Sequence, residues 1–143
     1  MADPRNDVDF TDIGYRAEHF KIDNSTITYS ATADNGSSQV GKAVKFSADK
    51  TVALTTDGSD VEGKLISVEP DLKAVVQTRG YCTLPGGNAA SLTLGKKIVG
   101  AVDGSSAGGY IREVNTATAA ELGLATGKII DNDTTTAVVV DLG

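Results

Sequence analysis

Short runs rich in Val, Ile and Thr recur through residues 39–143 and are separated by turn sequences. The runs follow one another at intervals of about 8–12 residues, a spacing typical of β-sandwiches and β-barrels. Within the runs, apolar side chains alternate with polar ones, as in strands that bury one face. The expected strands are Lys42–Phe46, Thr51–Thr55, Gly63–Val68, Lys73–Leu84, Lys97–Val102, Tyr110–Val114 and Thr135–Leu142. The sequence therefore predicts an all-β body, either a compact barrel or a sandwich.

One segment between the last two strands has a different composition. Asn115–Leu124 is dense in alanine and leucine, begins with residues that can serve as an N-cap and ends near glycine. This pattern predicts one short helix. Because so short a helix is not stable alone, we expect it to pack on the sheet.

Composition excludes several functional classes. The net charge of −6, with basic residues scattered along 143 positions, argues against a phosphate-binding surface and direct contact with nucleic acid. The single cysteine, Cys82, cannot form an intramolecular disulfide, and its place in the alternation predicts a buried, inert thiol. A polar, acidic N-terminus and the lack of any apolar stretch near ~20 residues predict neither a signal peptide nor a membrane span.

The first 38 residues differ from the rest in character. They contain seven acidic and three basic residues and four of the seven aromatic residues of the chain. Their apolar residues follow neither a helical nor a strand period. We expect an extended N-terminal arm over residues 1–38, which ends in a hinge at Ala33–Ser38, followed by the β body over residues 39–143.

Motifs that suggest chemistry lack the context that the chemistry requires. His19, the only histidine, lies in the expected arm, without the rigid partners of a catalytic or zinc site. Gly104–Gly108 spells a nucleophile elbow, but a strand is expected to follow it and no histidine lies downstream. Asp131–Thr134 lacks the glycine and glutamate of a calcium loop and is interpreted as a hairpin turn. We therefore expect no catalytic residues, no cofactor and no metal site.

The order of strands and turns is similar to that of a known family. The similarity is carried by Gly41–Phe46, Thr51–Leu54 with Asp57-Gly58, Val61–Val68 and Ala74–Leu84. These segments resemble the capsid decoration, or cement, proteins of tailed bacteriophages, and Ala137–Gly143 resembles the closing strand of that family. The resemblance covers roughly residues 39–143 and includes no catalytic signature.

The resemblance implies a structural protein of the virion. Such proteins have a β-rich body, often trimeric, that sits on the outer surface of the capsid and bridges copies of the major capsid protein. The expected role is to stabilise the shell against the internal pressure of DNA, after synthesis in the host cytoplasm. We expect a homotrimer, with a dimer as the alternative.

The contacts are expected to come from the arm, which the resemblance does not cover. Aromatic side chains provide large contact area at low entropic cost and are frequent interface hot spots. The predicted capsid or inter-subunit contact residues are Phe10, Tyr15, Phe20, Ile13 and Ile22. Two alternatives stay open: these rings pack on the body of their own chain, or the protein is a tail-fibre or receptor- or glycan-binding module of the virion.

Overall fold

The structure is a computed structural model that describes residues 13–143. It is all-β with one short helix, as the sequence predicts. The elements are β1 (Arg16–Ile22), β2 (Ala43–Ala48), β3 (Thr51–Leu54), β4 (Gly63–Val68), β5 (Lys73–Arg79), β6 (Tyr81–Leu84), β7 (Ile98–Ala101), β8 (Tyr110–Glu113), α1 (Ala119–Leu124), β9 (Lys128–Asp131) and β10 (Val138–Asp141).

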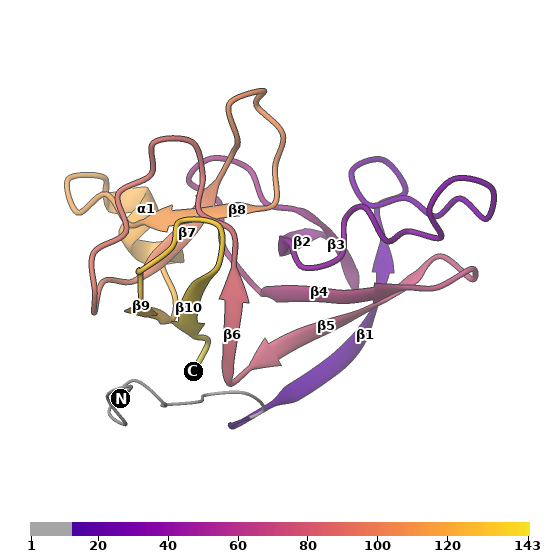
Figure 1. Ribbon diagram of the computed structural model, residues 1–143, viewed down its shortest axis with the longest axis horizontal. Helices are drawn as coiled ribbons and strands as arrows, with labels where there is room; N and C mark the ends of the chain where they lie inside the picture. The colour runs from indigo at the N-terminus through magenta and orange to yellow at the C-terminus, as the bar shows by residue number, and fades with distance from the viewer. Residues whose placement is uncertain (1–12) are drawn as a thin grey trace, which may run out of the picture.

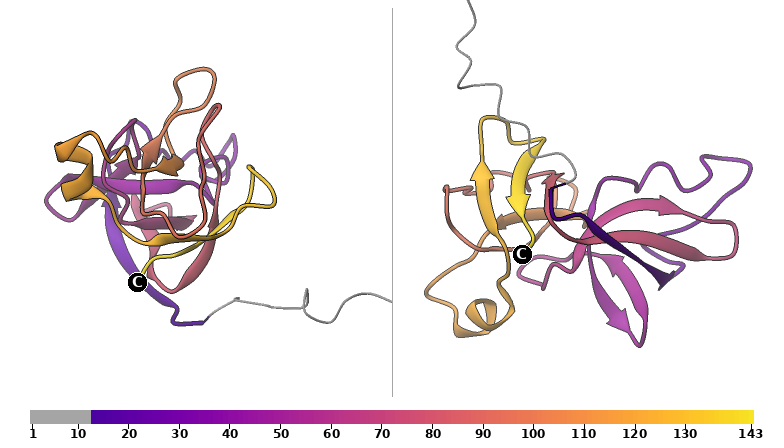
Figure 2. Two further views of the ribbon diagram at one scale, coloured as in Figure 1. Left: turned by 90° about the vertical axis from the view of Figure 1, so that its left-hand side faces the viewer. Right: turned by 90° about the horizontal axis from the view of Figure 1, so that it is seen from below.

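The first five strands close into a barrel in the order β1-β3-β2-β4-β5. β1 completes it, because it runs antiparallel to β5 over most of its length and pairs in parallel with the start of β3. The remaining strands form a three-stranded sheet, β6-β10-β9, and a two-stranded sheet, β7-β8. We call these strands with α1 the β6–β10 lobe, which lies beside the barrel (Figures 1 and 2).

Each of these two parts has its own apolar core. The barrel core contains Ile22, Ile27, Val44, Val52, Leu54, Leu65, Val68, Ala74 and Val76. The second core contains Ala43, Val61, Cys82, Leu84, Ile98, Ile111, Ile129, Val138, Val140 and Leu142. Neighbouring residues of β2 serve both cores, since Ala43 and Val44 point to opposite faces of the strand. The two parts are therefore joined through shared strands.

A bend at Gly80 divides the long run that the sequence predicts as one strand, Lys73–Leu84. The chain leaves the barrel as β5 and enters the other sheet as β6, with only Gly80 between them. Gly80 has φ +90, and a Cβ there would lie 2.6 Å from the carbonyl oxygen of Ile13. Only glycine satisfies both the positive φ and the close approach, so it fixes the corner.

The N-terminal region differs from the expected extended arm. Residues 16–22 form β1 of the closed barrel, and Ile27 is completely buried in its core. Within the expected hinge, Gly36 is buried against Val68, so close that a Cβ at Gly36 would lie 2.6 Å from Cβ of Val68, while most other hinge residues are exposed. These residues add to the barrel because it needs a fifth strand to close and apolar side chains to fill it. Residues 1–12 of the expected arm lie outside the described residues.

The helix α1 forms as expected, and its link to the sheet is polar. None of its residues is buried, and Leu122 and Leu124 are about half exposed. Instead, Glu121 accepts two hydrogen bonds from the guanidinium of Arg112 in β8, at 2.7 and 3.0 Å. Asp57 accepts a third from Arg112 at 2.9 Å. A bidentate ion pair therefore holds this short helix in place.

Candidate interaction surface

The chain enters the structure at the corner formed by Gly80. The carbonyl oxygen of Ile13 accepts a hydrogen bond from the backbone N–H of Tyr81 at 3.2 Å. Gly14, with φ +68, is so close that a Cβ there would lie 3.4 Å from Cα of Gly80. On the other side, the N–H of Leu142 donates to the carbonyl oxygen of Gly80 at 2.9 Å. The first described residues and the end of the chain thus meet at one corner.

Two predicted contact residues are displayed at this corner. Ile13 is 51% exposed and Tyr15 is 44% exposed, although both side chains are largely apolar. Their backbone is held by the Gly80 corner, so their side chains project from an ordered base. We call Ile13 and Tyr15 the corner patch. Phe10, the third residue of this group, lies outside the described residues.

The other two predicted contact residues belong to the barrel. Ile22 is 7% exposed and part of the barrel core, so its side chain offers no surface to a partner. Phe20 is half-buried against the same core and contacts the ring of Phe46 edge to face, with centroids 5.4 Å apart. For Phe20 and Ile22 the structure therefore supports the alternative that the side chains pack on their own body. The alternation in β1 explains this, because residues two apart share a face.

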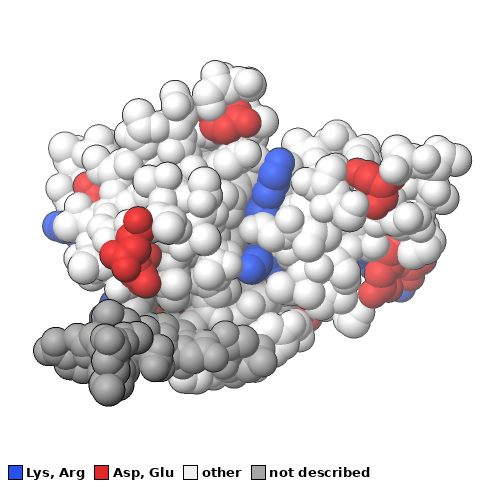
Figure 3. Space-filling view, in the orientation of Figure 1, with Lys and Arg blue, Asp and Glu red and all other residues white. Residues whose placement is uncertain are grey.

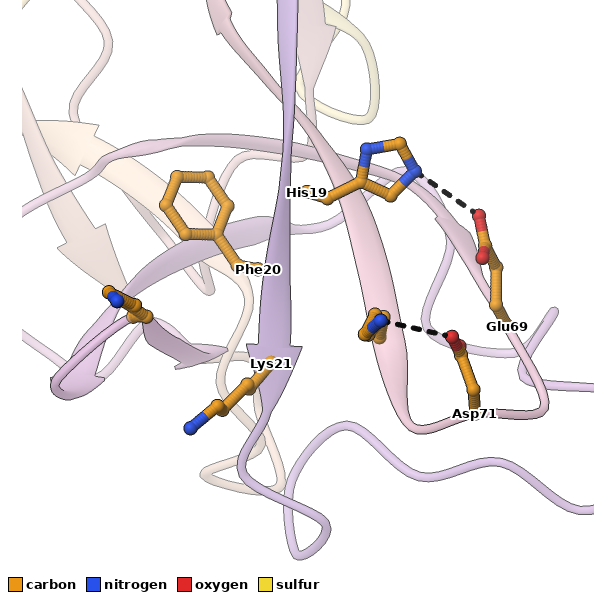
Figure 4. Close-up of a pocket in the computed structure, with 7 residues that line it drawn as sticks. His19, Phe20, Lys21, Glu69 and Asp71 are labelled. Carbon is orange, nitrogen blue, oxygen red and sulfur yellow. Dashed lines mark ion pairs between the residues drawn. The ribbon is translucent and has the colours of Figure 1, made fainter.

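A cleft lies at the end of β1 that is farther from the Gly80 corner. It has a volume of about 400 Å³ and is lined by His19, Phe20, Lys21, Lys50, Glu69, Asp71 and Lys73. We call it the Phe20 cleft. Figure 4 shows His19 and Phe20 projecting to opposite sides of β1, with Lys21 at the strand end. The cleft therefore has an aromatic side and a charged side.

The charges of the Phe20 cleft are unequally matched. His19 Nε2 lies 3.5 Å from Glu69, and Lys73 Nζ lies 3.4 Å from Asp71, as the dashed lines in Figure 4 mark. Lys21 and Lys50 have no ion pair within the described residues. The backbones of these two lysines are adjacent, since Lys21 N–H donates to the carbonyl oxygen of Lys50 at 2.8 Å. The cleft thus presents two unpaired cations beside an aromatic side chain.

A second basic region lies between the two parts of the molecule. Figure 3 shows basic side chains in the hollow between them, with acidic side chains farther out on both sides. Two lysines of the barrel side reach across to the β6–β10 lobe. Lys42 Nζ lies 5.6 Å from the ring centroid of Tyr110, and Lys64 Nζ donates to Thr83 Oγ1 at 3.1 Å. These lysines therefore already have contacts within the chain.

The residues that suggested chemistry are placed as follows. Cys82 is buried, and burial raises the pKa of its thiol to about 12. Ser106 lies in a loop between two strands, β7 and β8, as expected. Residues 131–134 begin at the last residue of β9 and lead toward β10, which pairs antiparallel with β9, so the expected hairpin is present. Across residues 13–143, no three His, Cys, Asp or Glu side chains are grouped so that they could hold a metal ion.

Comparison of the chain with protein families, with curated proteins and with solved structures found no match. In the described part of the chain, no helix is long and apolar enough to cross a membrane. The candidate surfaces must therefore be interpreted from their own geometry and charge.

Sequence reasoning missed the Phe20 cleft. It included Phe46 in the expected strand Lys42–Phe46 but singled out neither Phe46 nor Lys21 nor Lys50 as a surface residue. The alternation does place Phe46 toward the barrel interior, yet Phe46 is 43% exposed because it lies at the open end. No signal in the sequence could have found this, since β1 was not predicted and the closing of the barrel brings the cleft residues together.

Proposed function

We propose that this protein is a capsid decoration, or cement, protein of a tailed bacteriophage. It binds the outside of the assembled shell, bridges major capsid proteins and stabilises the shell against DNA pressure. The proposal rests on the resemblance of residues 39–143 to that family. One observation supports it most directly: the corner patch displays apolar side chains on a backbone fixed by Gly14 and Gly80.

The proposed contact differs from the arm expected from the sequence. Because β1 belongs to the barrel, we limit the proposed arm contact to the residues before β1, that is 1–15. Residues 1–12, when fully extended, span at most about 40 Å. The corner patch lies at the base of this segment, so both can touch the same partner. Ile13 and Tyr15 are the proposed capsid contacts, whereas Phe20 and Ile22 contribute to the barrel. Phe10 stays a predicted capsid or inter-subunit contact.

Multiple attachment increases the strength of such contacts. Burial of about 80 Å² more apolar surface on one corner-patch side chain contributes about 2 kcal/mol, which corresponds to about 30-fold in affinity. In a trimer, the second and third contacts form within one complex, so modest single contacts produce slow release. We therefore propose that the bound form is a homotrimer.

Binding to shells tests the proposal. Full-length protein is mixed with undecorated shells of the phage that encodes it, and the shells are sedimented through a cushion. We expect saturable co-sedimentation and a higher melting temperature of the shells. The double variant I13S/Y15S should bind at least 30-fold more weakly, because both apolar side chains are lost. No co-sedimentation of the wild-type protein under any salt condition would overturn the proposal.

A matched control removes an equally exposed apolar side chain elsewhere. Leu122 on α1 is 49% exposed, close to the value for Ile13, and lies on the β6–β10 lobe. The variant L122S should bind shells like the wild type. Equal losses for L122S and I13S/Y15S would contradict the assignment to the corner patch. Binding to host cells or glycans, with no binding to shells, would instead support the receptor-binding alternative.

A further inference from the structure

The Phe20 cleft is an incompletely covered end of the barrel. Phe20 lines this cleft and stacks edge to face on Phe46, which lies next to the cleft and is 43% exposed. A large aromatic side chain that is half-exposed beside a cleft provides a site where another aromatic ring can pack. The barrel end thus has apolar contact area that the described residues do not cover.

The charge at this end specifies the chemistry of an occupant. The cleft has three lysines against two carboxylates, in a chain whose net charge is −6. Asp71 and Glu69 face Lys73 and His19, which leaves Lys21 and Lys50 unpaired within the described residues. Such a site favours a ligand that combines an aromatic ring with carboxylates.

This chain contains a segment with that chemistry. Residues 7–12 read Asp7-Val8-Asp9-Phe10-Thr11-Asp12, which places three carboxylates around one phenylalanine. No lysine or arginine occurs among these six residues. They lie before the first described residues and lead directly into Ile13, which is held at the Gly80 corner.

Geometry decides between the chain's own cleft and that of a neighbour. Arg16 pairs with Arg79, and Ile13 bonds to Tyr81, so Ile13 lies beyond the Arg16 end of β1. Phe20 lies four residues along β1 in the opposite direction, about 13 Å from Arg16 at 3.3 Å per residue. Three residues join Phe10 to Ile13 and span at most about 10 Å. The Cα of Phe10 therefore cannot reach the Cα of Phe20 in its own chain, which makes the cleft of a neighbouring copy the more accessible site.

We propose that residues 7–12 of one copy dock into the Phe20 cleft of a neighbouring copy. The ring of Phe10 packs against Phe20 and Phe46, and the carboxylates beside it pair with Lys21 and Lys50. The contact is between two copies of this chain, and it does not rest on the proposed capsid role. It links each copy to the next through its N-terminal segment.

Cross-linking of the full-length protein tests this contact. Chains with ¹⁴N and chains with ¹⁵N are mixed in urea, refolded together and treated with a carbodiimide, which joins a carboxylate to an amine in contact. Trypsin then releases residues 6–16, which contain Asp7, Asp9 and Asp12. We expect this peptide joined to Lys21 or Lys50, with half of the products mixing the two isotopes. Products of a single isotope only, or no such product, would overturn the proposal.

Two variant pairs add a quantitative control. K21E/K50E reverses the two unpaired cations, and it should lose the cross-link and weaken self-association, measured by sedimentation equilibrium, at least tenfold. K96E/K97E makes the same charge change at two exposed lysines outside the cleft and should self-associate more strongly than K21E/K50E. In the background K21E/K50E, the changes D9K/D12K should restore association. Equal effects of the two lysine pairs would contradict docking at the cleft. Because shells are absent, failure here leaves the shell-binding assay unaffected.

Discussion

Gln77 lies inside the corner where the chain passes from the barrel to the β6–β10 lobe. It is 4% exposed, and its side-chain amide donates to the carbonyl oxygens of Arg79 and Tyr81, each at 3.0 Å. These two carbonyls flank Gly80, so one amide group satisfies the backbone on both sides of the bend. We predict that Q77M, which keeps the volume but removes both donors, destabilises the fold markedly.

The size of the effect follows from the two lost bonds. Each bond from this buried amide contributes about 1.5 kcal/mol net to the free energy of unfolding. The free energy of unfolding should therefore fall by about 3 kcal/mol. For a chain of 143 residues this corresponds to a drop of about 10 °C in melting temperature. Urea unfolding and thermal unfolding, each followed by circular dichroism, measure both quantities.

The other glutamine of the chain supplies the control. Gln39 bonds through its amide nitrogen to Ser38, and its buried Oε1 has no hydrogen-bond partner within the described structure. Q39M should therefore leave stability within about 0.5 kcal/mol of the wild type, or raise it slightly. If Q77M has the same urea midpoint and melting temperature as the wild type or Q39M, the role assigned to Gln77 is refuted.

Three further predictions concern titratable groups. The Cys82 thiol, whose pKa burial raises to about 12, should react with Ellman's reagent at pH 8 only in urea; rapid labelling of the native protein would contradict its burial. Partial burial alone would raise the pKa of Asp23, but hydrogen bonds from Ile27, Thr26 and Ser25 hold it below its ordinary value. The ionised Asp23 carboxylate therefore contributes fully to the free energy of unfolding above the unfolded pKa of about 3.9, and this contribution is lost as pH falls through the lower folded pKa. Between pH 7 and pH 2.5, the free energy of unfolding should fall less in D23N than in the wild type. R112K keeps the charge but cannot form the bidentate pair with Glu121, so it should lower the free energy of unfolding by about 1–2 kcal/mol. It should also speed amide exchange at Ala125, whose N–H donates to the carbonyl oxygen of Glu121. Unchanged exchange would show that the pair does not hold α1.

The shell-binding and cross-linking experiments separate two uses of the same N-terminal segment. The corner patch at Ile13 and Tyr15 is proposed to touch the capsid, and residues 7–12 are proposed to enter a neighbour's cleft. A variant such as K21E/K50E leaves the corner patch intact, and I13S/Y15S leaves the cleft intact. Comparison of the two in both assays shows whether shell binding needs contact between copies.

Local sequence was sufficient to predict most strands of residues 39–143. Alternation of apolar and polar residues located β2, β3, β4, β7, β8 and β10 within a few residues, because a strand with one buried face must alternate. Alternation also placed Cys82 correctly in the core. Composition located the helix. The ion pair between Arg112 and Glu121 that holds it could not be predicted, because the two residues lie nine positions apart in the sequence.

Only the tertiary structure determined that β1 forms and which side chains surround it. Phe20 and Ile22 were predicted to anchor an arm, since two large apolar residues among the seven of β1 are too few to define a strand without its neighbours. β1 exists because β3 and β5 offer it backbone partners and because their sheet must close. Closure also brings Phe46 to Phe20 and Lys50 to Lys21, residues that lie 26 and 29 positions apart. Local sequence determined most strands of residues 39–143, whereas pairing across long separations determined that β1 forms and which side chains share a surface.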